Sequence, residues 1–221
     1  MQITRSLELK TNARIQAGAT LLFLDEIQEC PKAIQSLRYF KEKMPNLHVI
    51  SAGSLLEFAL EQETFSFPVG RIEFIYLQPL SFYEFVDALG HDQLVKYLRE
   101  VTWQQPPEPV IHEQLIDLVS QYFVVGGMPK VVNNYVPNRS FIECKRLQST
   151  LLQTYRSDFG KYSKATQFKY LESTFERAPL LVGHHFKYSK MNPEMRARDL
   201  KVALEKLCLA GLIHRILKSS G

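Results

Sequence analysis

The chain has 221 residues, of which 45% are hydrophobic and 23% are charged, a composition that indicates a globular protein with one large or two small domains. It has no apolar run near the roughly 20 residues that cross a bilayer and no secretory signal pattern, so we expect no membrane span and a cytoplasmic location. Its three cysteines, Cys30, Cys144 and Cys208, form no Cys-x-x-Cys pair. This spacing argues against a disulfide framework or a zinc site.

The net charge of +4 conceals an asymmetry between the two parts of the chain. Residues 138–221 hold 16 Lys and Arg against 7 Asp and Glu, which gives +9. Residues 1–137 hold 11 against 16, which gives −5. The basic part suits DNA or an acidic protein partner, and a solvated basic helix face is the alternative.

The first half of the chain alternates between strand and helix patterns. Residues 1–20 are polar and indicate a linker or the remnant of an upstream helix. Leu21–Asp25 is continuously apolar up to its acid, which predicts a buried parallel strand. A helix is predicted over Ala33–Lys43, after a Pro31 start, and a second strand over Leu47–Ala52. This β-α-β order implies parallel strands.

Three further elements complete the predicted α/β portion. Ser54 can cap a short helix over Leu55–Leu60, because a Glu three residues after it completes a capping box. The apolar run Ile72–Leu77 predicts a third strand, which Pro79 ends. A helix is then expected over residues 82–89.

Beyond residue 90 the patterns are helical. We predict helices over residues 91–101 and 110–124, a short one over Lys130–Tyr135, a long one from Ser140 to Tyr162, and another over Phe168–Arg177. Proline-rich or glycine-rich breaks separate the first three.

The C-terminal segment predicts a helix from about Pro193 and a short strand over Leu212–Leu217. A helix, a glycine and a strand in this order resemble the third helix and first wing strand of a winged helix. The basic side chains of this segment are candidates for nucleic-acid contacts, although no array can be assigned to base edges. These candidates are Arg196, Arg198, Lys201 and Arg215.

Residues 21–28, Leu-Leu-Phe-Leu-Asp-Glu-Ile-Gln, place two adjacent carboxylates directly after an apolar strand. This pattern is typical of the Walker B strand of a P-loop NTPase. There the first acid, here Asp25, holds Mg²⁺ through its water shell, and the second, Glu26, orients and activates the attacking water. The alternative is that the two acids end a strand and cap the next helix.

Two other residues are candidates for the same site. Ser54 follows the second strand, where a hydroxyl can sense the γ-phosphate, and a helix N-cap is the alternative role. Arg71 precedes the predicted third strand, where a guanidinium can stabilise phosphate charge, in cis or across the interface of a homo-oligomer. A surface ion pair is the alternative for Arg71.

The phosphate-binding loop that serves such a strand is missing from this sequence. That loop reads Gly-x-x-x-x-Gly-Lys-Ser/Thr. The only Gly-Lys pair here is Gly160-Lys161, which Tyr162 follows, and Tyr155 stands where the first Gly is required. We therefore expect part of an ATPase that lacks its front end.

Seven motifs in this order resemble the AAA-type ATP-binding proteins of bacteria and archaea, in which an ATPase module precedes a C-terminal domain of unknown function. The motifs are Leu21–Gln28, Val49–Phe58, Phe67–Arg71, Leu77–Phe85, Val125–Val131, Leu151–Phe159 and Leu207–Arg215. The resemblance implies ATP and Mg²⁺ as cofactors of the full-length parent. It also implies Asp25 and Glu26 as the Walker B acids, Ser54 as a sensor-like residue, Arg71 as the arginine after it, and a winged-helix-like C-terminal segment.

The sequence departs from this family in two places: the P-loop is absent, and the chain ends where the family continues into a further α/β domain. We expect an α/β fold with a partial P-loop NTPase parallel sheet, followed by an α-helical region that ends in a winged-helix-like segment. The predicted domains are residues 1–90, 91–137 and 138–221. The parent is expected to hydrolyse ATP and this chain alone to be inactive. The rivals are a nucleic-acid-binding module and a protein-interaction module.

Overall fold

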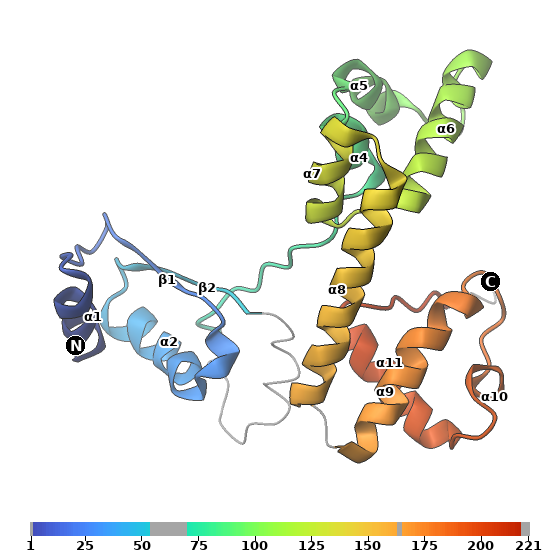
Figure 1. Cartoon of the computed structure of the whole chain (residues 1–221). Coiled ribbons are helices and arrows are strands. Elements are labelled where there is room, and N and C mark those ends of the chain that lie inside the picture. Colours follow the sequence, from blue (N-terminus) through green and yellow to red (C-terminus); the bar gives the residue numbers. More distant parts are fainter. Residues whose placement is uncertain (1, 54–69, 163–164, 218–221) are drawn as a thin grey trace. The chain divides into compact units, whose positions relative to one another are not determined.

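The computed structural model describes residues 2–53, 70–162 and 165–217 (Figure 1). The chain divides into two compact units. One unit contains residues 1–74 and 159–221, and the other contains residues 75–158. None of the helices in the described ranges is long and apolar enough to cross a membrane.

The N-terminal part of the first unit begins with helix α1, Gln2–Thr11. Strand β1, Leu21–Leu24, leads through the 3₁₀ turn η1, Ile27–Glu29, into helix α2, Pro31–Lys43. Strand β2, His48–Ser51, follows. Pro at the first position of α2 lacks the backbone N–H that a helix start leaves unpaired, which explains where α2 begins.

The two strands form a parallel pair, as the sequence predicted. Leu21 is opposite His48, and Leu24 is opposite Ser51. The prediction that β1 is buried is wrong, because Leu21 and Phe23 keep 53% and 54% of their surface exposed. A continuously apolar strand is buried only when both of its faces are covered. Within the described ranges, β1 has one neighbouring strand.

The predicted third strand over Ile72–Leu77 is also wrong, since these residues form no strand. A strand requires a neighbour that accepts and donates its backbone hydrogen bonds. None of the described residues forms such a ladder with this segment. Its side chains from Phe74 to Leu77 are exposed, Leu77 at 96%. The short helix predicted over Leu55–Leu60 lies outside the described residues.

The second unit is helical. It contains α4, Phe82–Ala88; α5, Asp92–Glu100; α6, Pro109–Val125; α7, Pro129–Asn138; and most of α8, Phe141–Tyr162. The predicted capping box is present, because the Ser81 hydroxyl accepts the Glu84 N–H while the Glu84 carboxylate accepts the Ser81 N–H at 2.7 Å. The core of this unit consists of Phe85, Val86, Leu89, Val95, Leu118, Val125, Val131, Val132, Tyr135 and Cys144.

The glycine-rich break between α6 and α7 packs directly against the start of α4. The Leu80 N–H donates to the Gly127 carbonyl at 2.7 Å, and the Tyr122 hydroxyl donates to the Leu80 carbonyl at 2.6 Å. A Cβ on Gly127 would overlap the Leu80 carbonyl oxygen. Glycine is therefore required at position 127 because two backbone segments approach closely there.

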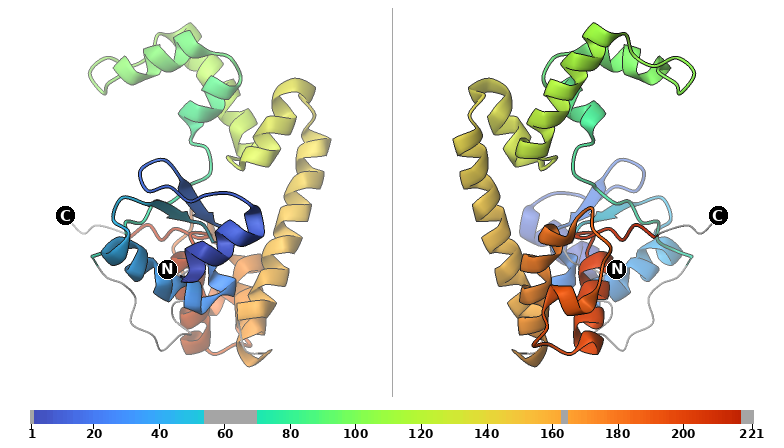
Figure 2. Two further views of the ribbon diagram at one scale, coloured as in Figure 1. Left: turned by 90° about the vertical axis from the view of Figure 1, so that its left-hand side faces the viewer. Right: turned by 90° about the vertical axis from the view of Figure 1, so that its right-hand side faces the viewer.

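The C-terminal part of the first unit contains α9, Ala165–Arg177; η2, Ala178–Leu181; α10, Tyr188–Met191; and α11, Ala197–Leu209. Helices α9 and α11 pack side by side (Figures 1 and 2). Side chains from α9, α10 and α11 are buried there: Leu171, Thr174, Met191, Leu200, Ala203, Leu204 and Leu207.

The short strand predicted over Leu212–Leu217 is wrong, because these residues form no ladder with another strand in the described ranges. The chain leaves α11 through a helix-capping motif. The Leu212 N–H donates to the Leu207 carbonyl and the Gly211 N–H to the Cys208 carbonyl, both at 3.0 Å. Gly211 has φ 69°, the left-handed conformation that this Schellman motif requires. A wing strand is not formed by the residues described up to 217, so the winged-helix assignment stays a prediction.

Candidate functional site

The two acids of the sequence motif lie at the carboxyl end of β1. Asp25 directly follows the strand, and Glu26 occupies the left-handed conformation with φ 48° and ψ 47°. The Glu26 N–H donates to Asp25 Oδ1 at 3.0 Å, which fixes the orientation of that carboxylate. Both acids are exposed. The two carboxylates are therefore accessible to a ligand that arrives from solvent.

Backbone hydrogen bonds tie the turn that carries these acids to the end of β2. The Ala52 N–H donates to the Leu24 carbonyl at 2.9 Å, and the Ile27 N–H donates to the Ala52 carbonyl at 3.0 Å. The two carboxyl ends of the parallel strands consequently meet at one edge. This is the edge at which open parallel sheets bind ligands.

Gln28 holds Glu26 from the interior side, a contact that the sequence analysis missed. The Gln28 side chain is buried, and its Nε2 donates to Glu26 Oε2. Its Oε1 is buried without a hydrogen-bond partner. A Cβ on Gly53 would overlap this oxygen, so a larger residue at position 53 would require the Gln28 amide to shift. The available signal was an amide residue two positions after Glu26.

Arg71 forms an ion pair at a different place. Its Nε donates to Glu42 Oε1 at 2.7 Å, and Arg38 Nε donates to the same oxygen at 2.9 Å. These contacts, with Arg38 the larger contributor, hold the pKa of the Glu42 carboxyl below its ordinary value. Glu42 lies in the last turn of α2, about 16 Å along the helix axis from Pro31 at a rise of 1.5 Å per residue.

The structure consequently brings Asp25 and Glu26 together and anchors Arg71 at the other end of α2. Ser54 lies outside the described residues, so its predicted place beside the acids stays a prediction. Among the described residues, no group of three or more His, Cys, Asp or Glu is arranged to hold a metal ion. A single exposed carboxylate such as Asp25 suits Mg²⁺, which keeps most of its waters and takes its other ligands from phosphate oxygens.

The basic candidates near the C-terminus occupy different surroundings, and all four are exposed. Lys201 Nζ lies 3.9 Å from Glu205 Oε1 on α11. Arg198 lines a hollow between α9 and α11. Burial raises the pKa of the Cys208 thiol, and the nearby Arg215 opposes that shift. Arg198 therefore lines the hollow, whereas Lys201 is paired within α11 and Arg215 lies near Cys208.

Comparisons with known protein families divide the chain in two. Residues 2–86 match the model of an AAA domain. Residues 116–221 match the model of a domain of unknown function, DUF8612. Searches of curated proteins and of solved structures found no match to the chain.

Proposed function

Because the chain carries an AAA domain segment in residues 2–86 and a domain of unknown function in residues 116–221, we propose that its strand edge is the hydrolytic side of an AAA-type ATPase site. The observation that carries this proposal is the exposed pair Asp25 and Glu26 at the carboxyl end of a parallel strand within the AAA match. In the parent protein, ATP hydrolysis would drive a conformational change that reaches the C-terminal domain.

Each acid has its own role in this proposal. Asp25 holds Mg²⁺ through water, because its carboxylate is exposed and one of its oxygens is already fixed by the Glu26 N–H. Glu26 accepts a proton from the attacking water. Gln28 is a positioning residue, since its amide orients the Glu26 carboxylate. Bound MgATP would supply the γ-phosphate that the water attacks.

Ser54 and Arg71 complete the proposed site. Ser54 would contact the γ-phosphate or the water from the end of β2. Arg71 is better placed to act across a subunit interface than in cis, because Glu42 anchors it at the far end of α2 from the acids. An arginine supplied by a neighbouring subunit implies a homo-oligomer.

The residues present fit the metal and water side of an ATP site and do not fit the phosphate-cradling side. The sequence contains no Gly-x-x-x-x-Gly-Lys-Ser/Thr loop. That loop supplies the backbone N–H groups and the lysine that bind the phosphates. We therefore propose that this chain alone neither binds ATP tightly nor hydrolyses it. We also propose a cytoplasmic location, where ATP is available to the parent protein.

A calorimetric titration of the chain with ATP and Mg²⁺, together with a phosphate-release assay, tests whether this chain alone binds and hydrolyses ATP. We expect a dissociation constant in the millimolar range or weaker, and no phosphate release above the rate of a buffer blank. A micromolar dissociation constant would overturn the claim that this chain lacks the phosphate-cradling side of the ATP site. If binding is that tight and Asp25→Asn leaves it unchanged, the assignment of the acids to the site is overturned as well.

A second candidate function is a protein-interaction module. The exposed apolar side chains of the strand pair favour it, since Leu21, Phe23 and Ile50 each keep more than half of their surface exposed. A partner surface packed on this face of the strand pair would cover them. Light scattering tests it: a mass of twice the monomer that Phe23→Lys reduces to the monomer supports this role, and a monomer at all concentrations removes self-association.

A further inference from the structure

Helices α9 and α11 enclose a groove on the surface of the domain of unknown function. Its volume is about 480 Å³. The helices are held together below it by buried apolar side chains, among them Leu171, Leu200 and Leu207. The groove walls are Thr166, Gln167, Lys169, Tyr170, Leu171, Arg198, Asp199, Val202, Ala203 and Lys206. Two helices that pack against each other thus form the walls of the groove.

The charged groups of the groove are predominantly basic. Lys169 comes from α9, and Arg198 and Lys206 come from α11, so cations line both walls. Asp199 is the single acid among the lining residues, which leaves a net charge of +2 in the groove. A concave surface with this excess attracts anions and concentrates them between its walls.

Helical spacing separates this basic face from the rest of α11. Arg198, Val202 and Lys206 are four residues apart and share one face. Leu200 and Leu204 lie on the buried face. Lys201 instead pairs with Glu205 and does not line the groove. Two equal positive charges on one helix, Lys201 and Lys206, thus differ in position, and only Lys206 lines the groove.

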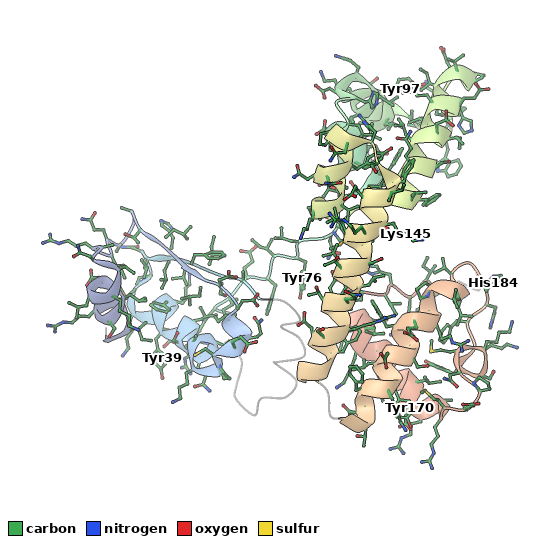
Figure 3. The ribbon with its side chains drawn as sticks, viewed as in Figure 1. Tyr39, Tyr76, Tyr97, Lys145, Tyr170 and His184 are labelled. Atoms are coloured by element: carbon green, nitrogen blue, oxygen red, sulfur yellow. The ribbon has the colours of Figure 1, made fainter. Side chains whose placement is uncertain are left out.

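An aromatic ring stands among the cations. Lys169 Nζ lies 5.0 Å from the centroid of the Tyr170 ring. Lys206 Nζ donates to Gln167 Oε1 at 3.4 Å, so a polar contact joins the two walls. Figure 3 shows Tyr170 among the side chains of the α9 and α11 region. The partly exposed ring can therefore pack against a planar ligand group while the cations contact its charge.

We propose that this groove binds single-stranded nucleic acid. Lys169, Arg198 and Lys206 would contact phosphates, and Tyr170 would stack on a base. An acidic peptide offers carboxylates but no flat base for the ring, and a duplex offers phosphates while its bases stay stacked on one another. The inference does not depend on the ATPase proposal, because all four residues lie outside residues 2–86.

Three phosphate contacts predict how strongly binding depends on salt concentration. For single strands the logarithm of the association constant falls with the logarithm of salt concentration by about 0.7 per contact, which gives a slope of about −2 for three contacts. Raising the salt from 50 to 200 mM should then weaken binding about 20-fold. A variant with one remaining contact should lose only about threefold over the same range.

The experiment measures fluorescence anisotropy of a labelled 20-nucleotide thymidine strand with the full 221-residue chain. We expect the double variant Lys169→Gln/Lys206→Gln to bind at least tenfold more weakly at 50 mM salt and to reduce the slope to about −0.7. The control Lys187→Gln/Lys190→Gln removes the same charge from exposed residues of the same unit that do not line the groove, and it should stay within twofold of the wild type. Circular dichroism melting of each variant confirms that it is folded.

Substitutions of Tyr170 distinguish the contribution of base stacking to binding from the contribution of charge. Tyr170→Leu should weaken binding about tenfold while the salt slope stays near −2, and Tyr170→Phe should bind as the wild type does. Equal losses in the groove and control variants, tighter binding of the annealed duplex, or displacement by polyglutamate at equal charge concentration would each overturn the proposal. So would the absence of binding by the wild type at 50 mM salt.

Discussion

The helical unit of residues 75–158 and the strand pair of the N-terminal segment differ in how completely their apolar side chains are buried. In the helical unit Phe85, Val86 and Val131 are completely buried. In the strand pair Phe23 and Ile50 remain more than half exposed, although they are equally apolar. The helical unit therefore contains its own core. The strand pair presents an exposed apolar face, and the two acids follow the carboxyl end of its first strand.

The comparison predicts that stability is concentrated in the helical unit. Phe85→Ala should lower the free energy of unfolding by about 3–5 kcal/mol, because a fully buried ring is lost and a cavity remains. The control Phe123→Ala removes a ring that is 81% exposed and should change it by no more than about 0.5 kcal/mol. Urea denaturation measures both. Equal effects would contradict the idea that burial in this unit dominates.

Gly127 provides a sharper probe of the same unit. Gly127→Ala should cost about 1–3 kcal/mol, because its Cβ would overlap the Leu80 backbone, which cannot yield as a side chain can. Gly160→Ala in α8 should instead stabilise by up to about 1 kcal/mol, since the nearest atom to its Cβ is 3.9 Å away and Ala favours helix. Opposite signs in thermal melting are expected, and two stabilising results would refute the close approach.

The smallest effect concerns acid sensitivity at the start of α4. Hydrogen bonds from the Ser81 backbone and hydroxyl lower the pKa of Glu84. A carboxyl whose folded pKa lies below its unfolded value of about 4.3 stabilises the fold above that value and ceases to do so as the pH falls through the folded pKa. Glu84→Gln should therefore lower the melting temperature at pH 7, and this difference should shrink as the pH falls through the folded pKa of Glu84. A constant difference across this range would show that the charge is irrelevant.

Sequence patterns predicted the helices well because each helix satisfies its own backbone hydrogen bonds. The capping box at Ser81 and the proline start of α2 follow from local chemistry alone. Strand predictions were reliable only where a partner exists. Leu47–Ala52 contains β2, which pairs with β1, whereas Ile72–Leu77 is as apolar and forms no strand. A strand forms only when a neighbouring strand pairs with its backbone, and an apolar run does not indicate whether such a strand is present.

The candidate site was predictable to a similar extent. The position of Asp25 and Glu26 after an apolar strand could be inferred, since parallel strands bring their carboxyl ends to one edge. The Gln28 contact and the Glu42 anchor of Arg71 could not, because they depend on the fold of the turn and on the length of α2. The groove on α9 and α11 was missed because Lys169 and Lys206 are 37 positions apart in the sequence.

Paramagnetic broadening by Mn²⁺ in the presence of ATP tests the central claim most directly, with Mn²⁺ replacing Mg²⁺ at the acids. In amide NMR spectra we expect signals of residues 25–28 and Gly53 to broaden first, Asp25→Asn to remove the effect, and Asp87→Asn, an exposed acid of α4, to leave it intact. Broadening that spreads over acidic residues throughout the chain, or that survives Asp25→Asn, would contradict a metal site at this strand edge.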